Sequence, residues 1–301
     1  MSTNTQVSNE LPLPAAKPRI KKKNPYIDIW YRLLKNKLAV VSLGVLVLLV
    51  LTALLADVIA PYPANEQNLT NILQAPNALH WLGTDAYGRD ILSRIIYGSR
   101  ISLQVGFVAV TFSVTLGGII GAIAGFYGGS TDNILMRFMD ILLAIPGILL
   151  AIAIVNVLGP GLVNVMIAVG IASLPTYARI VRASVLSIRD QEFVEASRAI
   201  GESNFSIIRR NVLPNCLAPI IVQATLGVAW AILSAAGLSF IGLGLQPPTP
   251  EWGAMLSEGR QYIYEAYWVT TFPGIAIALV VLALNIFGDG LRDAMDPRLK
   301  Q

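Results

Sequence analysis

The sequence predicts an all-α polytopic membrane protein with six transmembrane helices, and two observations lead to that prediction. Of its 301 residues, 54% are hydrophobic and only 13% are charged, whereas about 25% of the residues in a soluble domain are charged. In addition, five long stretches contain no Asp, Glu, Lys, Arg or His. Too few polar side chains remain to cover a water-facing surface, which argues against a soluble enzyme, a nucleic-acid-binding protein and a disordered chain.

The uncharged stretches define the expected spans, because a membrane-crossing helix needs about 20 apolar residues. The third stretch contains Gly159-Pro160-Gly161, which divides it into two helices, and the fourth ends in a Pro-rich segment that cannot continue a helix. The first span is too long for a signal peptide and is followed by five more, so we expect it to be retained. The six expected spans are 38–60, 101–126, 135–158, 162–180, 215–240 and 268–288.

The basic residues predict the orientation of these spans. With six spans both termini lie on one side, and 18 of the 22 lysines and arginines fall on that side. The other side holds only Arg89, Arg94, Arg100 and Arg260. By the positive-inside rule both termini are cytoplasmic. We expect a basic N-terminal tail over 1–37 that contacts anionic lipid rather than nucleic acid, a membrane domain over 38–288 and a C-terminal tail over 289–301.

Little side-chain chemistry is available to this chain. Cys216 is its one cysteine and His80 its one histidine, so we expect no metal site and no catalytic residue. Cys216 is expected to be a small buried hydrophobic residue and His80 a surface residue.

No acidic residue falls within the long apolar stretches, which disfavours a proton relay. Arg137 and Asp140, near the third span, fit an interfacial ion pair. The dipeptide Gly-Lys is absent, so a Walker A loop is absent and any ATP must be bound by another subunit.

The segment from Asp190 to Pro214 is the most informative of the cytoplasmic connections. It predicts two short helices over 191–200 and 204–211, with Gly201 at the turn and Pro214 opening the fifth span. Two interpretations fit this pattern. The helices could lie on the membrane surface, with Phe193, Ile207 and Ile208 inward. Alternatively, they could form a rigid pair that enters a groove on a partner and passes its motion into the membrane.

The spacing within this segment resembles a known motif. Glu195-Ala196-Ser197, three residues, Gly201, and then Leu213-Pro214 is similar to the EAA loop of binding-protein-dependent ABC importer permeases, whose pattern is E-A-A, three residues, G, nine residues, I, one residue, L-P. Ser197 stands where the pattern often has Ala, and Asn211 stands where Ile is usual. The resemblance implies that 190–214 is the loop that couples the permease to a cytoplasmic ATPase. It assigns that role to Glu195, Ala196, Ser197, Gly201, Leu213 and Pro214.

Three further segments resemble the C-type permeases of dipeptide and oligopeptide importers, most closely the dipeptide permeases. They are the stretch from Leu82 to Gly106, the stretch GLSFIGLG followed by QPPTPEWG over 237–253, and GDGLRDAMDP over 288–297. The resemblance covers residue 26 to the carboxyl end. It implies a type I ABC importer permease fold in a bacterial inner membrane and no cofactor on this chain. The implied partners are a homologous second permease, two ATPase subunits that carry ATP and Mg²⁺, and an extracytoplasmic peptide-binding protein.

The expected function is therefore to move dipeptides or short peptides inward by alternating access. A metal-chelate importer or a peptide exporter of the same family is the nearest alternative. An ATP-independent carrier or channel is an alternative of another class, which the uncharged spans and the loop spacing disfavour. A structural scaffold would not need Gly201 and Pro214 at this spacing.

Polar side chains within the spans are candidates to line the substrate path. These are Gln104, Asn156, Gln223 and Asn285. Hydrogen bonds between helices are the competing explanation for each of them. Pro146 and Pro175 are expected to kink the third and fourth spans, either for packing or to open a path.

Two further groups of residues are expected to pack rather than bind. Asp85, Arg89, Asp90 and Arg94 can form a charge network that ties down the extracytoplasmic stretch before the second span. Gly117, Gly121 and Gly125 form a small-residue stripe that permits close helix approach, either within the subunit or to a partner permease.

Overall fold

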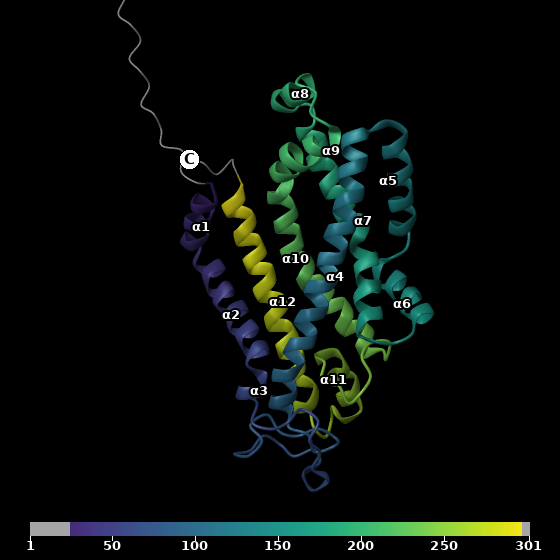
Figure 1. Cartoon of the computed structure of the whole chain (residues 1–301). Coiled ribbons are helices and arrows are strands. Elements are labelled where there is room, and N and C mark those ends of the chain that lie inside the picture. Colours follow the sequence, from purple (N-terminus) through teal and green to yellow (C-terminus); the bar gives the residue numbers. More distant parts are fainter. Residues whose placement is uncertain (1–24, 297–301) are drawn as a thin grey trace, which may run out of the picture.

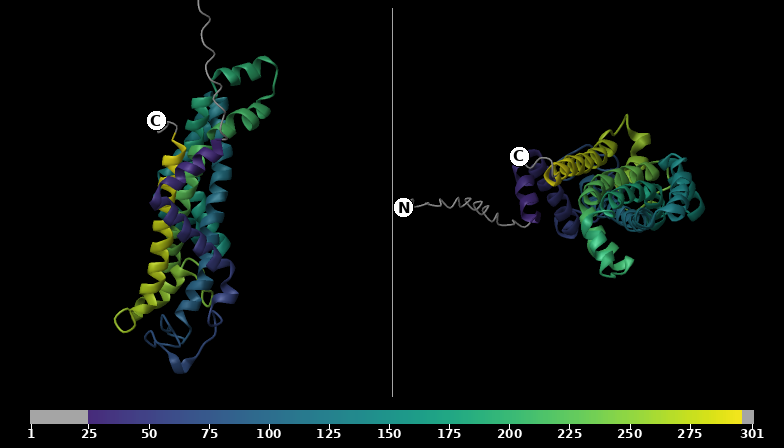
Figure 2. Two further views of the ribbon diagram at one scale, coloured as in Figure 1. Left: turned by 90° about the vertical axis from the view of Figure 1, so that its left-hand side faces the viewer. Right: turned by 90° about the horizontal axis from the view of Figure 1, so that it is seen from above.

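The computed structural model describes residues 25–296, and its long helices lie side by side in one elongated bundle (Figures 1 and 2). The ribbon has two distinct ends (Figure 1). We call one the α8 end, because it carries α8 together with α1 and the last turn of α12; we call the other the α11 end, because it carries α11, α3 and the segment 60–90. The helices of the bundle are α1 (Pro25–Lys35), α2 (Lys37–Leu54), α3 (Ala56–Ile59), α4 (Ile91–Tyr127), α5 (Gly129–Leu143), α6 (Gly147–Leu158), α7 (Leu162–Ile188), α10 (Leu213–Phe240) and α12 (Trp268–Met295).

Among the described residues, five uninterrupted helical stretches are long and apolar enough to cross a membrane: α2, α4, α7, the stretch Asn204–Phe240 that ends in α10, and α12. The expected third span over 135–158 is instead two helices, α5 and α6, which meet at an angle of 88°. The six predicted spans match the structure when this bent pair is counted as one. The first span is shorter than expected, because α2 ends at Leu54 and α3 follows as a separate turn.

The break between α5 and α6 is centred on Pro146. A proline has no N–H to donate into a helix, and its ring disfavours helical backbone at the residue before it. Helix α5 accordingly ends at Leu143, before the proline. Pro146 has ψ of 129° and precedes the first turn of α6, where its carbonyl accepts from the Leu150 N–H at 3.0 Å. The predicted kink at Pro146 is confirmed and is a complete break, whereas α7 continues through Pro175 without interruption.

The glycine stripe of α4 packs within the subunit, against α7. A Cβ added at Gly117 would lie 2.7 Å from the carbonyl oxygen of Leu174, and one at Gly125 would lie 3.0 Å from that of Arg182. The same close approach lets the Ser113 hydroxyl of α4 donate to the carbonyl of Gly170 in α7 at 2.7 Å. Of the two interpretations of the stripe, the structure selects helix packing inside this chain.

The α11 end is held by buried ion pairs between the start of α4 and α11 (Trp252–Gly259). Arg89 donates to Asp85 at 2.6 Å and to Glu258 at 2.8 Å, and Arg94 donates to the same Glu258 oxygen at 3.2 Å. The side chains of both arginines are almost inaccessible to solvent. The predicted network is therefore confirmed for Asp85, Arg89 and Arg94, and Glu258, which is distant in the sequence, completes it.

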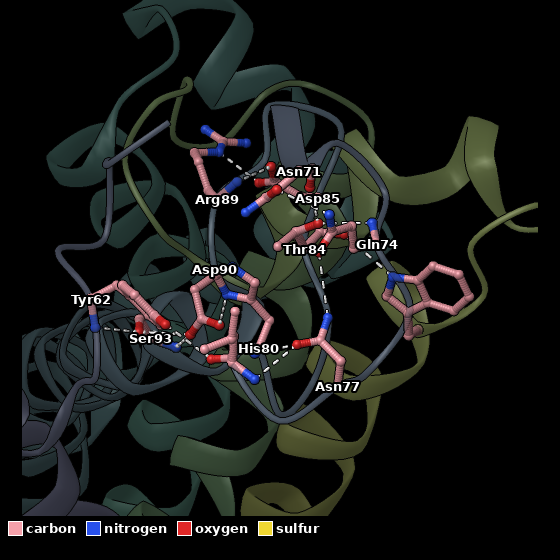
Figure 3. Close-up of polar contacts among 12 residues, drawn as sticks. Tyr62, Asn71, Gln74, Asn77, His80, Thr84, Asp85, Arg89, Asp90 and Ser93 are labelled. Atoms are coloured by element: carbon pink, nitrogen blue, oxygen red, sulfur yellow. Dashed lines mark hydrogen bonds and ion pairs between the residues drawn. The ribbon is translucent and has the colours of Figure 1, made fainter. Parts of the chain in front are cut away.

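Asp90 belongs to a second polar group, which contains His80 (Figure 3). One carboxylate oxygen of Asp90 lies 2.9 Å from His80 Nδ1, and the other accepts from the backbone N–H and the hydroxyl of Ser93 at 2.8 and 2.7 Å. Asp90 thus caps the N-terminus of α4. The expectation that His80 is a surface residue is wrong, because His80 is only 7% exposed.

Another ion pair differs from the expected one. Asp140 of α5 accepts from Arg179 of α7 at 2.6 Å rather than pairing with Arg137. Residues three apart can meet along one helix, but here packing of α5 on α7 brings the closer partner.

Candidate functional site

The segment 190–214 projects from the bundle at the α8 end (Figures 1 and 2). It contains α8 (Glu192–Ala199) and α9 (Asn204–Ile207), so the prediction of two short helices around Gly201 is confirmed. The second helix is shorter than expected, since it continues into a π-helical turn, Ile208–Val212, and through it into α10. Both ends of the projecting segment are thus attached to long helices, α7 and α10.

Gly201 forms the turn between the two short helices. Its φ is +81°, and its N–H donates to the carbonyl of Arg198 at 3.0 Å while the Glu202 N–H donates to that of Ser197 at 3.1 Å. These two bonds define a Schellman motif, in which the residue with positive φ is usually glycine. No atom lies within 4 Å of a Cβ built at Gly201. Glycine is therefore required here by the backbone conformation and not by lack of space.

The π turn explains the position of Pro214. Leu213 N–H donates to the carbonyl of Ile208, five residues back, and Pro214 has no N–H with which to continue an α-helical pattern. The helical stretch is continuous from Asn204 to Phe240, and the wider π turn directly before Pro214 accommodates a residue that has no donor. Leu213 and Pro214 consequently mark the point at which the loop becomes α10.

One face of the projecting segment is buried against the bundle. Val194 of α8, Ile207 of α9 and Val212 are fully buried, in a cluster with Val185 of α7 and Cys216 of α10. The burial of Cys216 confirms its predicted role as a small hydrophobe. Phe193, which the membrane-surface interpretation places inward, is 41% exposed, because the helix turns Val194 toward the cluster instead.

The opposite face of α8 is open and carries both charge and apolar surface. Glu195 and Ala196 are exposed, Ile200 is 82% exposed, and Phe205 of α9 is 72% exposed. Phe193, Ala196 and Ile200 follow the i, i+3, i+7 spacing of one helix stripe. We call this set, Phe193, Glu195, Ala196 and Ile200, the exposed α8 face.

The predicted coupling residues thus separate into four positions. Glu195 and Ala196 lie on the exposed α8 face, Gly201 is the turn, and Leu213 with Pro214 starts α10. Ser197 is half-buried and faces the bundle, where it accepts a hydrogen bond from Asn211. The sequence reasoning missed Glu202, which accepts from Asn211 and Ser206.

A wide apolar groove of about 1020 Å³ runs along the spans between α2, α4, α10 and α12. Of the four polar residues proposed to line a path, only Gln104 borders it, together with Thr111 and Thr115 of α4. Asn156 donates to the carbonyl of Ile152 in its own helix at 3.0 Å. Within the described residues, the side chains of Gln104, Gln223 and Asn285 make no hydrogen bond between helices.

Within residues 25–296, no group of three or more His, Cys, Asp or Glu side chains is arranged to hold a metal ion.

Comparisons with known proteins agree with this architecture. Residues 117–301 match the family model described as "Binding-protein-dependent transport system inner membrane component", and residues 24–76 match "N-terminal TM domain of oligopeptide transport permease C". The chain is 52% identical to the dipeptide transport system permease protein DppC of Alkalihalophilus pseudofirmus, over 92% of this chain and 91% of that one. It is 47% identical to the di/tripeptide transport system permease protein DppC of Pseudomonas aeruginosa, over 95% of this chain and 97% of that one.

A third relative and two solved structures extend the comparison. The glutathione transport system permease protein GsiD of Escherichia coli O6:K15:H31 is 46% identical over 96% of this chain and 95% of its own. An inward-facing MetNI methionine ABC transporter chain superposes with a TM-score of 0.56 at 22% identity, covering 68% of this chain and 98% of that one. An amino acid ABC transporter crystallised with histidines superposes with a TM-score of 0.52 at 20% identity, covering 69% of this chain and 95% of that one. These folds, together with the sequence matches, show that the chain belongs to the family of binding-protein-dependent transport system inner membrane components.

Proposed function

We propose that this chain is one permease subunit of an ATP-driven importer that carries dipeptides or other short peptides across a bacterial inner membrane. The observation that carries the proposal is the projecting α8 segment, which is anchored to two long helices and exposes one face. The substrate class follows from the curated relatives, which are named as dipeptide, di/tripeptide and glutathione permeases. These names disfavour a metal-chelate importer.

The α8 end is the cytoplasmic end in this proposal. Arg198, Arg209 and Arg210 are exposed there, as the positive-inside rule expects. At the α11 end, by contrast, Arg89 and Arg94 are buried in ion pairs and Arg100 pairs with Asp57 at 2.8 Å. The rule counts lysines and arginines rather than net charge, and the α11 end has far fewer of them than the α8 end. Both chain termini would then be cytoplasmic.

The remaining subunits complete the importer. Two cytoplasmic ATPase subunits would bind ATP and Mg²⁺, a second permease would pair with this one, and an extracytoplasmic binding protein would deliver the peptide at the α11 end. Residues 190–214 would couple this chain to one ATPase.

The exposed α8 face is the surface that would dock on the ATPase. Its apolar stripe can fill a groove, and Glu195 can pair with a basic residue at the rim. Since α8 joins α7 on one side and continues through α9 and the π turn into α10 on the other, a displacement of α8 would be passed to both helices. Docking would therefore depend on Glu195 and Ala196, and the geometry of the turn on Gly201. The displacement would reach α10 through Leu213 and Pro214.

Substitution of Gly201 tests the coupling role. Gly201→Val forces a β-branched residue into positive φ, at a cost of about 1–3 kcal/mol. We expect membrane abundance to be retained and peptide uptake per ATP hydrolysed to fall about tenfold or more in proteoliposomes.

Gly242→Val is the matched control. Gly242 has φ of +84°, no atom within 4 Å of a built Cβ, and the same Schellman bonds, from its N–H to Ser239 and from Leu243 N–H to Leu238. It follows α10 at the α11 end, so it carries equal strain far from α8. Uptake per ATP that is unchanged in Gly201→Val would overturn the coupling assignment.

The apolar groove is the part of the peptide path that this chain would contribute, completed by the second permease. Gln104 supports this because it borders the groove, and an amide at that position is costly in hydrocarbon unless it contacts water or substrate. We expect Gln104→Leu to slow peptide transport about tenfold, as an increase of about 1.4 kcal/mol in the rate-limiting barrier would. Gln223→Leu, the same change outside the groove, is the control. Equal rates for the two variants would remove Gln104 from the path.

A further inference from the structure

We propose that a polar network of four residues, Ser197, Glu202, Ser206 and Asn211, sets the angle at which α8 presents its exposed face to the ATPase. These are positioning residues, since their side chains bond to one another while the exposed α8 face makes the contact. The inference rests on the proposed coupling function, and it assigns a role to Glu202, Ser206 and Asn211, to which the loop resemblance gives none.

Asn211 is the centre of the network. Its Nδ2 donates one hydrogen bond to the Ser197 hydroxyl at 2.8 Å and another to the Glu202 carboxylate at 3.3 Å. The second Glu202 oxygen accepts from the Ser206 hydroxyl. The Ser197 hydroxyl in turn donates to the carbonyl of Phe193 at 3.1 Å. Both hydrogens of the Asn211 amide group are thus used, and its two acceptors lie on different sides of the Gly201 turn.

The network is needed because little else fixes α8. An isolated helix of eight residues is not stable in water, and the only fully buried side chain on α8 is Val194. Besides Val194, the Arg198 guanidinium of α8 lies over the Phe126 ring of α4, 5.3 Å from its centroid. The bond from Asn211 to Ser197 adds a hydrogen-bonded attachment one turn beyond Val194, and these separate points together define the direction of α8.

The π turn contributes to the geometry. Asn211 lies within Ile208–Val212, where the bonding pattern includes one more residue than an α-helical turn. Because each residue of an α-helix advances by about 100°, one extra residue changes which side of the helix a position faces. The half-buried Asn211 side chain is directed here toward Ser197 and Glu202. The backbone of the loop and its polar side chains therefore specify one arrangement together.

The two positions that differ from the EAA pattern are in direct contact in the folded chain. Ser197 and Asn211 are 14 residues apart and form one hydrogen bond. A polar pair here replaces the apolar residues of the pattern, so each member depends on the other and on Glu202 rather than on the bundle alone.

An exchange of donor and acceptor tests the network without changing side-chain shape. Asn211→Asp removes both donors and places a carboxylate against Glu202. We expect the ATP hydrolysed per peptide transported by the complete importer in proteoliposomes to rise about tenfold. Adding Glu202→Gln restores a donor opposite the new carboxylate, and we expect the double variant to return to within about twofold of the natural protein. Asn204→Asp is the control, because Asn204 is exposed in the same loop and its side chain makes no hydrogen bond among the described residues.

The outcomes separate this inference from the proposed function. Uncoupling by Asn211→Asp with rescue by the double variant, at equal membrane abundance and equal copurification of the ATPases, supports the network. Normal coupling in Asn211→Asp, or uncoupling that the double variant does not relieve, overturns it. If Gly201→Val uncouples while Asn211→Asp does not, the coupling role stands and only the network falls. If neither uncouples, both fall.

Discussion

Arg94→Met is expected to destabilise the α11 end by about 3–5 kcal/mol, the cost of breaking a buried ion pair. Arg94 donates to Glu258 at 3.2 Å and to the carbonyls of Ala64 and Pro248, both at 3.3 Å. It therefore joins the segment 60–90, the stretch before α11 and α11 itself to the start of α4. Its loss leaves Asp85 and Glu258 with Arg89 as their only cationic partner among the described residues.

The measurement is the apparent midpoint of thermal unfolding of the detergent-purified protein. Arg260→Met is the matched control, since Arg260 is exposed and makes no ion pair within the described part of the chain. Both variants lose one positive charge at the same end of the bundle. Equal midpoints for the two would show that the buried network does not hold this end together.

Gly121→Val is expected to destabilise the packing of α4 on α7 by about 3 kcal/mol, at the upper end of the usual cost of overpacking. A Cβ at Gly121 would overlap the carbonyl oxygen of Ala178 and lie 3.0 Å from the backbone nitrogen of Arg182. Backbone atoms of a packed helix cannot rotate away as a flexible side chain can. The two helices would have to separate, which would also break the bond from Ser113 to Gly170.

Gly118→Val is the control in the same helix. The nearest atom to a Cβ at Gly118 is Val181 Cγ2 at 4.0 Å, which is ordinary contact. Both variants replace a helical glycine by valine, so their intrinsic helix propensities change equally. We expect a lower unfolding midpoint and lower membrane abundance for Gly121→Val alone. If Gly118→Val lowers both as much, close packing at Gly121 is not the cause.

The sequence predicted the local features well, because they depend on residues that are near one another in the chain. Runs of apolar residues located the spans, and Pro146 located the break in the third. The Gly201 turn was predictable since a single residue with positive φ governs it. The resemblance to the EAA loop depends in the same way on spacing within about 20 residues.

Contacts between distant segments could not be predicted in this way. Arg94 and Glu258 are 164 residues apart, and the residues around one of them do not indicate the other as its partner. His80 looked like a surface residue because a lone histidine near a span end has no local partner, yet Asp90 and Tyr62, whose ring centroid is 5.0 Å from that of His80, enclose it. Asp140 likewise had a neighbouring arginine in its own helix and pairs with Arg179 of another.

The sequence by itself determined that this protein is a helical membrane bundle with a projecting loop of defined spacing, because hydrophobicity, proline and glycine act over a few residues. The tertiary structure alone decided which face each helix buries and which polar groups meet. It turned the glycine stripe toward α7, Phe193 outward and Asn211 toward Ser197. The physical reason is that burial and hydrogen bonding depend on the packing of helices distant in the chain, which no local pattern encodes.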